Sequence, residues 1–367
     1  MQTKTIVAVL GCGLACGLAT GAWATTVTFR ETMRSDVSAF TSSTSAWYIG
    51  KSCASVAWNG SEAFIGGQSF DTSGSAVSKF RPHLNDTSTD ALLSGKFGSL
   101  TQVATRGIQD LALRADGTLA VAWDNGSNNN NGFRMFDSNG TATATATFGS
   151  RGNGAHFDPI DGKLTGIGLG SGRVFKFNDD GSTYNDGVKN WNSTTGPLIF
   201  PNPANTSTNR DLTMDLAGNI YWRAQNSILR ALRNGDGLGY AAPTQLKASG
   251  VDNVNGQNIE FIKSPTNPDM LIYSNRVSGA NGQSLTNIVN AMDLMGNAIT
   301  LDIQFRADYG APNTGNGYYD FSYNAATQSL AMSDFANNTV YFFEVVPAPG
   351  TAVLLGLGGL LVGRRRR

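Results

Sequence analysis

The sequence of 367 residues has few cysteines and histidines, the side chains that most often bind transition metals. It contains three cysteines and two histidines. His83 and His156 stand apart from any spaced group of Cys, His or Glu, which gives a zinc site little support. A Gly-x-Ser-x-Gly motif is also missing, and no serine has a triad partner by pattern. These absences argue against zinc enzymes and serine hydrolases.

Charged side chains are scarce too, at 15% of the chain, with 27 basic and 27 acidic residues. Five of the basic residues, Lys4 and the last four arginines, lie in two end segments that contain no acid. The chain between those segments therefore has 22 basic and 27 acidic residues, a net charge of −5. A mildly acidic surface without basic clusters argues against nucleic acid or anionic lipid as a partner.

The C-terminal segment 346–367 has three consecutive parts. Its first part is a Val-Pro-x-Pro element formed by Val346, Pro347, Ala348 and Pro349. An apolar run from 352 to 362 follows, and the chain ends with Arg364, Arg365, Arg366 and Arg367. Arginine stays charged and is costly to move through a bilayer, so the cluster should remain on the cytoplasmic side. The apolar run is shorter than the ~20 residues of a stable membrane span, which favours a temporary anchor.

In this order of parts the tail resembles the PEP-CTERM sorting signal of Gram-negative bacteria. The resemblance covers only 346–367, and Ala348 and Gly350 stand where that family has glutamate and, usually, serine. It implies transient anchoring by a short transmembrane helix in the inner membrane and removal of the tail by an exosortase-type enzyme. The protein would then reach the cell surface or the exopolysaccharide. Ala348 leaves open which enzyme reads the tail, and an uncleaved tail anchor is the alternative.

The N-terminal segment 1–24 predicts a signal peptide. A basic Lys4 precedes an apolar stretch from 6 to 18, and Ala22 and Ala24 satisfy the small-x-small rule of signal peptidase. Cleavage there would make Thr25 the first residue of the exported chain.

The cysteines fit an exported chain without internal disulfides. Cys12 and Cys16 would leave with the signal peptide, so that only Cys53 remains. A lone cysteine is either a buried small hydrophobic residue or a thiol that pairs with another chain. A lipoprotein signal that uses Cys12 or Cys16 is the alternative for the N-terminal segment.

Residues 25–345 are rich in Gly, Asn, Ser and Thr and show no amphipathic helix, a composition typical of an all-β exported protein. One pattern occurs six times: a short alternating strand, a turn and a second strand. The six segments are ASVAWNGSEAFIGG from Ala54, DLALRADGTLAVAWD from Asp110, AHFDPIDGKLTGIGL from Ala155, DLTMDLAGNIYWRAQ from Asp211, NIEFIKSPTNPDMLIYS from Asn258 and DFSYNAATQSLAMSD from Asp320.

Further strands follow these hairpins, whose turns recur at intervals of about 45–60 residues. Third strands are predicted within 132–140, 172–181, 227–237 and 338–345, and a fourth within 141–148. Four antiparallel strands at this period fit a β-propeller blade of ~40–50 residues. The sequence therefore predicts an all-β, six-bladed β-propeller over 25–345, with strand material between Val27 and Tyr48 completing the last blade. A β-sandwich or two jelly-roll domains is the alternative.

The turns carry a second resemblance. The segment DLAGNIY, from Asp215 to Tyr221, is similar to the D-x-x-G-N-I-Y phrase of NHL-type and gluconolactonase-like six-bladed propellers. Asp-Gly pairs such as Asp116-Gly117 suit a type I′ hairpin turn, so the likeness supports the fold more than an activity. Gluconolactonase-like propellers keep a catalytic metal near the central channel, which implies a metal-dependent lactone hydrolase as one alternative function.

The start of each innermost strand is a candidate ligand position. Aligning the six units by their turns places there Cys53, Asp110, Ala155, Asp211, Asn258 and Asp320. The four oxygen-bearing side chains among them, those of Asp110, Asp211, Asn258 and Asp320, suit Ca²⁺ or a similar cation. The alternative is that these short acceptors cap backbone N–H groups at strand ends and order water in the channel, with no cofactor.

Trp191 is a candidate for carbohydrate binding, because it lies in a polar Asn-Trp-Asn loop where an exposed aromatic ring can stack on a sugar. Taken together, the sequence predicts an exported protein of structural or binding type, without catalysis, at the cell surface or in the exopolysaccharide. Its expected processing partners are signal peptidase and an exosortase-type enzyme. The alternatives are a metal-dependent propeller hydrolase and an extracellular carbohydrate-binding protein.

Overall fold

The computed structural model describes residues 26–347, except for 43, 45–47, 69–74, 83–91, 101–106, 125–131, 148–150, 170–173, 186–208, 225–226, 238, 249–257, 265–266, 279–283 and 311–316. The signal segment 1–24, His83, Trp191 and the tail from Ala348 onward lie outside the described residues. Two one-turn 3-10 helices, Ser38–Phe40 and Ala307–Tyr309, are the only helices in the described part of the chain. Neither is long and apolar enough to cross a membrane.

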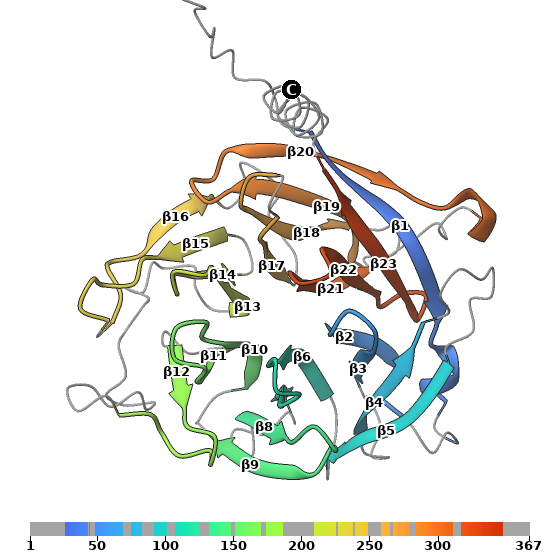
Figure 1. Cartoon of the computed structure of the whole chain (residues 1–367), viewed down its shortest axis with the longest axis horizontal. Helices are drawn as coiled ribbons and strands as arrows, with labels where there is room; N and C mark the ends of the chain where they lie inside the picture. Colours follow the sequence, from blue (N-terminus) through green and yellow to red (C-terminus); the bar gives the residue numbers. More distant parts are fainter. Residues whose placement is uncertain are drawn as a thin grey trace, which may run out of the picture.

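The described strands form five sheets, arranged around a central axis in a propeller-like, all-β fold (Figure 1). Three of these sheets have four strands and one has three. The first contains β2 (Ser52–Trp58), β3 (Ala63–Gln68), β4 (Ser75–Arg81) and β5 (Leu92–Leu100). The second contains β6 (Gly107–Leu113), β7 (Leu119–Asp124), β8 (Gly132–Phe136) and β9 (Ala142–Thr147). The third contains β10 (Gly152–Phe157), β11 (Leu164–Gly168) and β12 (Val174–Phe177), and the fourth contains β13 (Asn209–Met214), β14 (Ile220–Ala224), β15 (Ser227–Ala231) and β16 (Thr244–Lys247).

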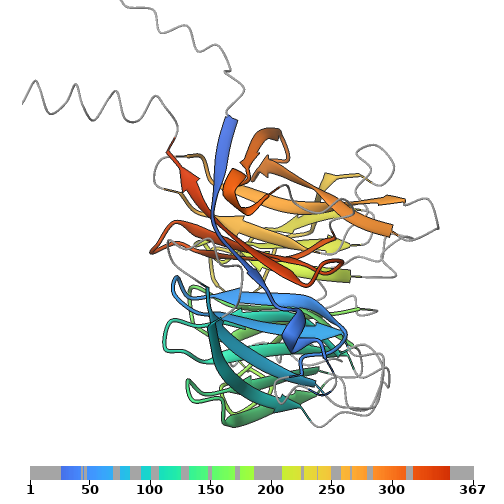
Figure 2. The same cartoon turned by 90° about the vertical axis from the view of Figure 1, so that its right-hand side faces the viewer.

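The fifth sheet has eight strands in the order β17-β18-β19-β20-β1-β23-β22-β21. One half contains β17 (Ile259–Ile262), β18 (Met270–Ser278), β19 (Ser284–Asp293) and β20 (Ala298–Gln304). The other half contains β21 (Tyr318–Asn324), β22 (Ser329–Asp334), β23 (Thr339–Val346) and β1 (Thr26–Asp36). The long β1, blue in Figure 2, pairs with β23 in the antiparallel direction. Because β1 also pairs in parallel with β20, the described sheets number five where the sequence predicts six blades.

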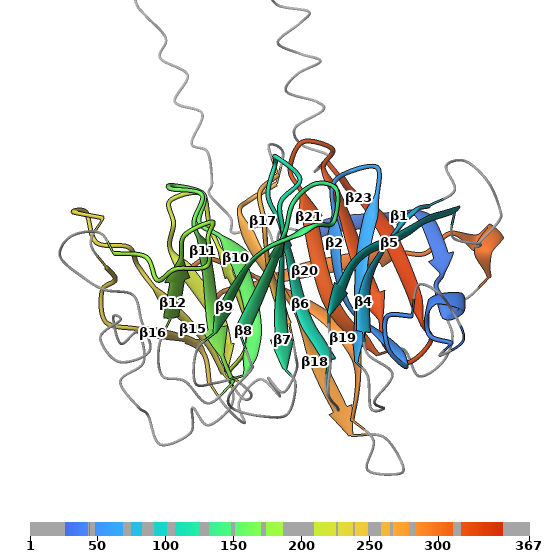
Figure 3. The same cartoon turned by 90° about the horizontal axis from the view of Figure 1, so that it is seen from below.

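All six predicted hairpins are present, and β1 completes the sheet of β21–β23 as the sequence predicts. The turns between inner strands, such as β2–β3 and β10–β11, lie on one side of the molecule (Figure 3). The type I′ prediction is wrong, because φ is positive at Gly117 (87°) but not at Asp116. The N–H of Gly117 donates to the carbonyl of Arg114, and that of Arg114 donates to the carbonyl of Thr118. This pattern is typical of a three-residue loop that ends in a left-handed glycine.

Apolar side chains fill the spaces between neighbouring sheets, as in a propeller, and do not form the single interlayer core of a sandwich. Trp222 of β14, for example, packs in one cluster with Ile167 and Val174 of the adjacent sheet. Close packing also explains why β11 is rich in glycine. A Cβ atom on Gly166 would lie 2.0 Å from Cζ of Phe133, so only glycine fits between these strands.

A buried ion pair holds β1 against the segment that follows β20. Glu31 is 1% exposed and accepts hydrogen bonds from Nε and Nη2 of Arg34, at 2.7 and 3.0 Å. Its Oε2 also accepts the backbone N–H of Arg306 at 2.8 Å, and Arg34 donates to the carbonyl of Tyr309. These bonds fix the strand that joins the two halves of the eight-stranded sheet.

We expect Glu31→Ala to lower the free energy of unfolding by about 3–5 kcal/mol, because it leaves the buried Arg34 without its carboxylate. Guanidinium denaturation of the full chain measures this change. The matched control is Glu344→Ala, which breaks the exposed ion pair between Arg30 of β1 and Glu344 of β23 and should cost less than about 1 kcal/mol. Equal, small losses in both variants would contradict this role of Glu31.

Candidate functional site

The pairing register defines a ring of six equivalent positions around the central axis. In five of the six inner strands, the pairing with the second strand of the hairpin skips one residue near the start of the inner strand. The first residue after the skip is again paired with a residue of the second strand, and this residue is the ring position. The sixth position directly precedes β17, where the carbonyl of Asn258 accepts the N–H of Ser274. The ring consists of Ser55, Asp110, Gly154, Asp211, Asn258 and Asp320.

This ring corrects two of the six predicted positions. Ser55 takes the place predicted for Cys53, and Gly154 the place predicted for Ala155. Both errors have the same cause, since alignment by the turn glycines assumes loops of equal length, whereas the β2–β3 loop is shorter and the β10–β11 loop longer than the β6–β7 and β13–β14 loops. Cys53 is fully buried in an apolar cluster, and burial raises the pKa of its thiol, which makes it a buried small hydrophobic residue. The other four positions were predicted correctly.

The three aspartates of the ring connect neighbouring sheets. Each carboxylate accepts the N–H of the next residue in its own strand and an N–H from the inner strand of the following sheet. The donors are Leu111 and Ala155 for Asp110 (2.7 and 2.6 Å), Leu212 and Ile259 for Asp211 (2.7 and 2.9 Å), and Phe321 and Val56 for Asp320 (2.8 and 2.8 Å). Aspartates therefore occupy every second one of the six inner strands around the axis, and each one caps strand N–H groups, as in the alternative to a cation site.

A second ring lies two residues further along the inner strands. Thr213 accepts the N–H of Phe261 at 3.1 Å and donates its hydroxyl to Oε2 of Glu260 at 3.2 Å. Oε1 of Glu260 accepts the N–H of Tyr323 at 2.9 Å. His156 occupies the corresponding position of β10. The sequence prediction missed Glu260 and His156 as site residues. Glu260 could have been found, because it lies two residues after the predicted ring position Asn258.

The carboxyl groups of both rings have raised pKa values. Burial raises the pKa of Asp110 to about 7 and that of Glu260 to about 8. Burial, and next the charge of Asp110, raise the pKa of Asp211 and Asp320 well above its usual range. Glu260 therefore keeps its proton at neutral pH, and the aspartates resist carrying a full charge each.

His156 is neutral in this site and presents an acceptor. Its Nδ1 lies 2.8 Å from the carbonyl oxygen of Phe157. Because a carbonyl only accepts, Nδ1 carries the hydrogen in this contact, and Nε2 of the neutral ring is an acceptor. Burial lowers the pKa of the imidazole and so favours this neutral form.

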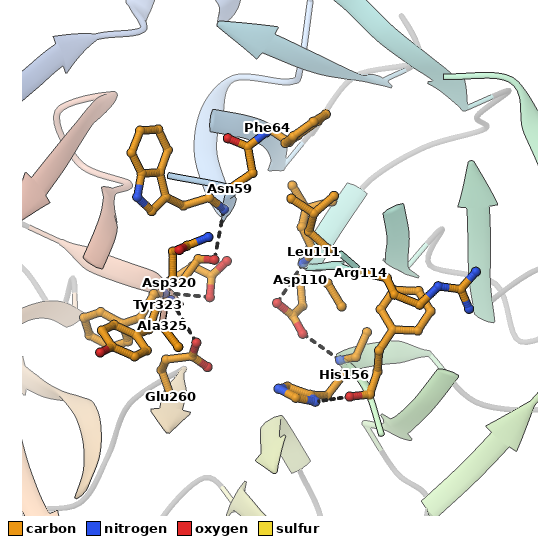
Figure 4. Close-up of a pocket in the computed structure, with 18 of the residues that line it drawn as sticks. Asn59, Phe64, Asp110, Leu111, Arg114, His156, Glu260, Asp320, Tyr323 and Ala325 are labelled. Carbon is orange, nitrogen blue, oxygen red and sulfur yellow. Dashed lines mark hydrogen bonds between the residues drawn. The ribbon is translucent and has the colours of Figure 1, made fainter. Parts of the chain in front are cut away.

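A cavity of about 480 Å³ lies between the inner strands, and both rings contribute to its wall. Asp110, His156, Glu260 and Asp320 project from different strands toward this central space (Figure 4). Five aromatic residues also line the cavity: Trp58, Phe64, Phe157, Phe321 and Tyr323. The wall thus combines neutral or partly protonated polar groups with aromatic rings.

The ring is a poor match to a cation site in its present geometry. Every aspartate of the ring uses both carboxylate oxygens as acceptors of backbone N–H groups, and Asn258 donates its amide to Asp320 at 2.9 Å. Within the part of the chain that the structure describes, no group of three or more His, Cys, Asp or Glu side chains is placed to hold a metal ion. The calcium assignment of Asp110, Asp211, Asn258 and Asp320 stays a prediction.

No protein-family model matches this sequence, and the comparison with curated proteins found no match either. Solved structures share its fold. An auxiliary nutrient binding protein from Bacteroides ovatus is 11% identical, with 86% of this chain and 73% of that chain covered and a TM-score of 0.52. The calcium-binding protein regucalcin from Agrobacterium tumefaciens is 13% identical, with 87% and 96% covered and a TM-score of 0.50. Virginiamycin B lyase from Staphylococcus aureus is 11% identical, with 85% and 98% covered and a TM-score of 0.50. At such low identity these likenesses show the propeller-like fold alone.

The raised pKa of Glu260 predicts a specific dependence of stability on pH. The folded state binds this proton more tightly than the unfolded state, whose carboxyl has a pKa of 4.5. The resulting stabilisation is complete below pH 4.5 and is lost as the pH rises through about 8. Denaturation at a series of pH values should therefore show the free energy of unfolding of the wild type falling, relative to Glu260→Gln, by a few kcal/mol across this range.

The exposed Glu344→Gln is the control for this pH series, and its curve should run parallel to that of the wild type. Parallel curves for the wild type and Glu260→Gln would show that the carboxyl of Glu260 titrates normally, against the burial seen here.

Proposed function

We propose that this chain is an exported six-bladed propeller that binds a small, neutral, hydroxyl-rich ligand in its central cavity. The blade count treats the eight-stranded sheet as two blades of four strands, which meet where β1 pairs with β20. Each half begins at the axis with an inner strand, β17 or β21, that supplies one position of the ring. Six inner strands with one ring position each support six blades.

The polar wall of the cavity is the observation that carries the binding role. Glu260 with its proton is a donor, and Nε2 of His156 is an acceptor, so neither demands a charged partner. Aromatic residues such as Trp58 and Tyr323 line the same cavity. Such a combination suits a sugar-sized ligand, whose hydroxyls donate and accept and whose ring faces are apolar. The fold of the nutrient binding protein from Bacteroides ovatus agrees with a binding role.

We further propose that the protein has no catalytic activity of its own. The fold it shares with regucalcin, described as calcium-binding, and with a lyase supports the rival class of metal-dependent propeller enzymes. Against that class, the carboxylates of Asp110, Asp211 and Asp320 are engaged with backbone N–H groups that connect the sheets. A cation would have to replace those bonds.

Calorimetric titration of the full chain with a panel of neutral monosaccharides and disaccharides tests the binding role. We expect at least one sugar to bind, with an affinity reduced about tenfold or more in His156→Ala and in Glu260→Ala, since each loses a hydrogen bond to the ligand. Trp191→Ala is the matched comparison and should leave the affinity unchanged. Loss of binding in Trp191→Ala alone would place the sugar site at that residue.

A Ca²⁺ titration under the same conditions addresses the enzyme alternative. Tight Ca²⁺ binding that disappears in Asp320→Asn would favour the metal-dependent hydrolase over the binding role.

The export proposal rests on the two ends of the sequence, and the fold is compatible with it. Thr28 of β1 is paired with Val346 at the end of β23, so the folded body begins and ends at one place. The N–H of Val345 donates to the carbonyl of Gln328 in the β21–β22 turn, which places both ends on the side of the inner hairpin turns. Cleavage after Ala24 and beyond Val346 would remove no residue of β1 or β23.

Mass spectrometry of the native protein from membrane, surface and medium fractions tests sorting. We expect a surface or medium species that begins at Thr25 and lacks the arginines 364–367. Replacement of all four arginines by glutamine should abolish tail removal, because the cytoplasmic stop is lost, while Ala348→Glu should be processed at least as well as the wild type. An intact chain in the cytosol, with neither end cleaved, contradicts export.

A further inference from the structure

Arg223 of β14 is a buried cation without a hydrogen-bonding partner. Its side chain is 0% exposed, and Nε, Nη1 and Nη2 all lack an acceptor among the described residues. Burial lowers the pKa of the guanidinium to about 9, so that it still carries its charge at neutral pH. An isolated buried charge with unsatisfied N–H groups is costly, and native structures ordinarily compensate it with a partner, a water or an ion.

The position of Arg223 is defined by its neighbours in the sheet. Tyr221 lies two residues earlier and Ile228 is its direct partner on β15, so all three side chains share one face. Tyr221 and Ile228 pack with Tyr273 of β18 in the space between these two sheets. Cζ of Arg223 lies 5.4 Å from the ring centroid of Tyr273. The side chain of Arg223 therefore lies between its own strand, β14, and β18 of the neighbouring sheet.

The nearest acidic group does not complete the site. Asp211 is the partner of Arg223 on β13, and its charge favours the guanidinium. However, the carboxylate oxygens of Asp211 accept the N–H groups of Leu212 and Ile259, and no hydrogen bond joins it to Arg223. Burial and neighbouring carboxylates also raise the pKa of Asp211, which weakens it as a counter-ion.

The repeats show that the fold itself does not require an arginine here. In every inner hairpin, one residue of the second strand lies directly opposite the ring residue of the inner strand. Apart from Arg223, the residues at these places are small or apolar: Gly66, Ala122, Ile167, Ser274 and Ser333. A large cation at one of six equivalent places points to a role other than packing.

A second unpaired donor lies beside the first. Asn290 of β19 is the direct partner of Tyr273, and its side chain shares the face of Met292, which packs in the same cluster as Tyr273. Its Nδ2 is buried and has no partner in the described part of the chain. Two donor groups therefore adjoin the ring of Tyr273, and the described residues supply no acceptor for either.

We propose that the space between β14 and β18 binds a small oxyanion, a carboxylate or a phosphate, through the guanidinium of Arg223 with the amide of Asn290 as second donor. The planar fork of arginine matches two oxygens of such an anion, and the bound charge would neutralise the buried cation. A water molecule would satisfy an N–H group but not the charge. This site is separate from the sugar-sized ligand proposed for the central cavity and does not depend on it.

Thermal unfolding of the full chain in sodium acetate, in sodium phosphate and in sodium chloride of equal ionic strength tests the proposal. We expect acetate or phosphate to raise Tm saturably by about 2 °C or more over chloride, and the anion that does so identifies the ligand as a carboxylate or a phosphate. In Arg223→Ala this rise should vanish, while Tm in chloride should equal or exceed that of the wild type. Asn290→Ala should raise the half-saturating concentration about three- to tenfold.

Arg134→Ala is the matched control, since its half-buried guanidinium already donates to the carbonyl of Phe133 and lies 4.5 Å from the ring of Trp123. It should keep the full effect of the anion. Arg223→Met retains the apolar stem and replaces the alanine variant if that variant does not fold. The proposal is overturned if neither oxyanion exceeds chloride, if both Arg223 variants keep the effect, or if Arg134→Ala also loses it.

Discussion

Three buried carboxylates hold the inner strands of neighbouring sheets together, and the rest of the structure depends on these contacts. Sheets packed around an axis have no backbone ladder between their innermost strands, so strand-end N–H groups there need other acceptors. Asp110, Asp211 and Asp320 supply them from every second inner strand. A carboxylate with two such bonds is fixed in orientation, and its position in turn fixes the side chains two residues further along.

The cavity follows from this arrangement. Because the carboxylates are buried close to one another, their pKa values rise, and the carboxyl groups that line the central space are neutral or only partly charged. Glu260 and His156 stand on the inner strands between those of the aspartates, β17 and β10, and share this environment. Under the proposed function, the polar, uncharged ligand would therefore lie among the same inner strands whose aspartates connect the sheets.

Much of the fold could be predicted because hairpins leave local marks in a sequence. Gly117 and its equivalents stand where the chain turns, and apolar residues alternate on both sides, so the six inner hairpins and four of the six ring positions were predicted correctly. The lengths of the inner loops leave no comparable mark, and because the β2–β3 and β10–β11 loops differ in length from the others, Cys53 and Ala155 were assigned in place of Ser55 and Gly154. The turn type was wrong because Asp-Gly suits both a type I′ turn and a type I turn followed by glycine.

The functional surroundings were harder to predict, since they depend on contacts between distant segments. Glu260 matters through its bonds to Thr213 and Tyr323, and Arg223 through the absence of an acceptor in the neighbouring sheet. Neither property is visible in a local pattern. The joining of two predicted blades into one sheet by β1 is likewise a long-range event, fixed by the bonds of Glu31 to Arg34 and Arg306.

Native-state hydrogen exchange tests the central role of the aspartates most directly. The amides of Val56, Ala155 and Ile259 donate to carboxylates of a neighbouring sheet and should be among the slowest to exchange in the chain. In Asp320→Ala the amide of Val56 should exchange at least about tenfold faster, while that of Ala155, which is bonded to Asp110, stays protected. Unchanged protection of Val56 in this variant would contradict the account.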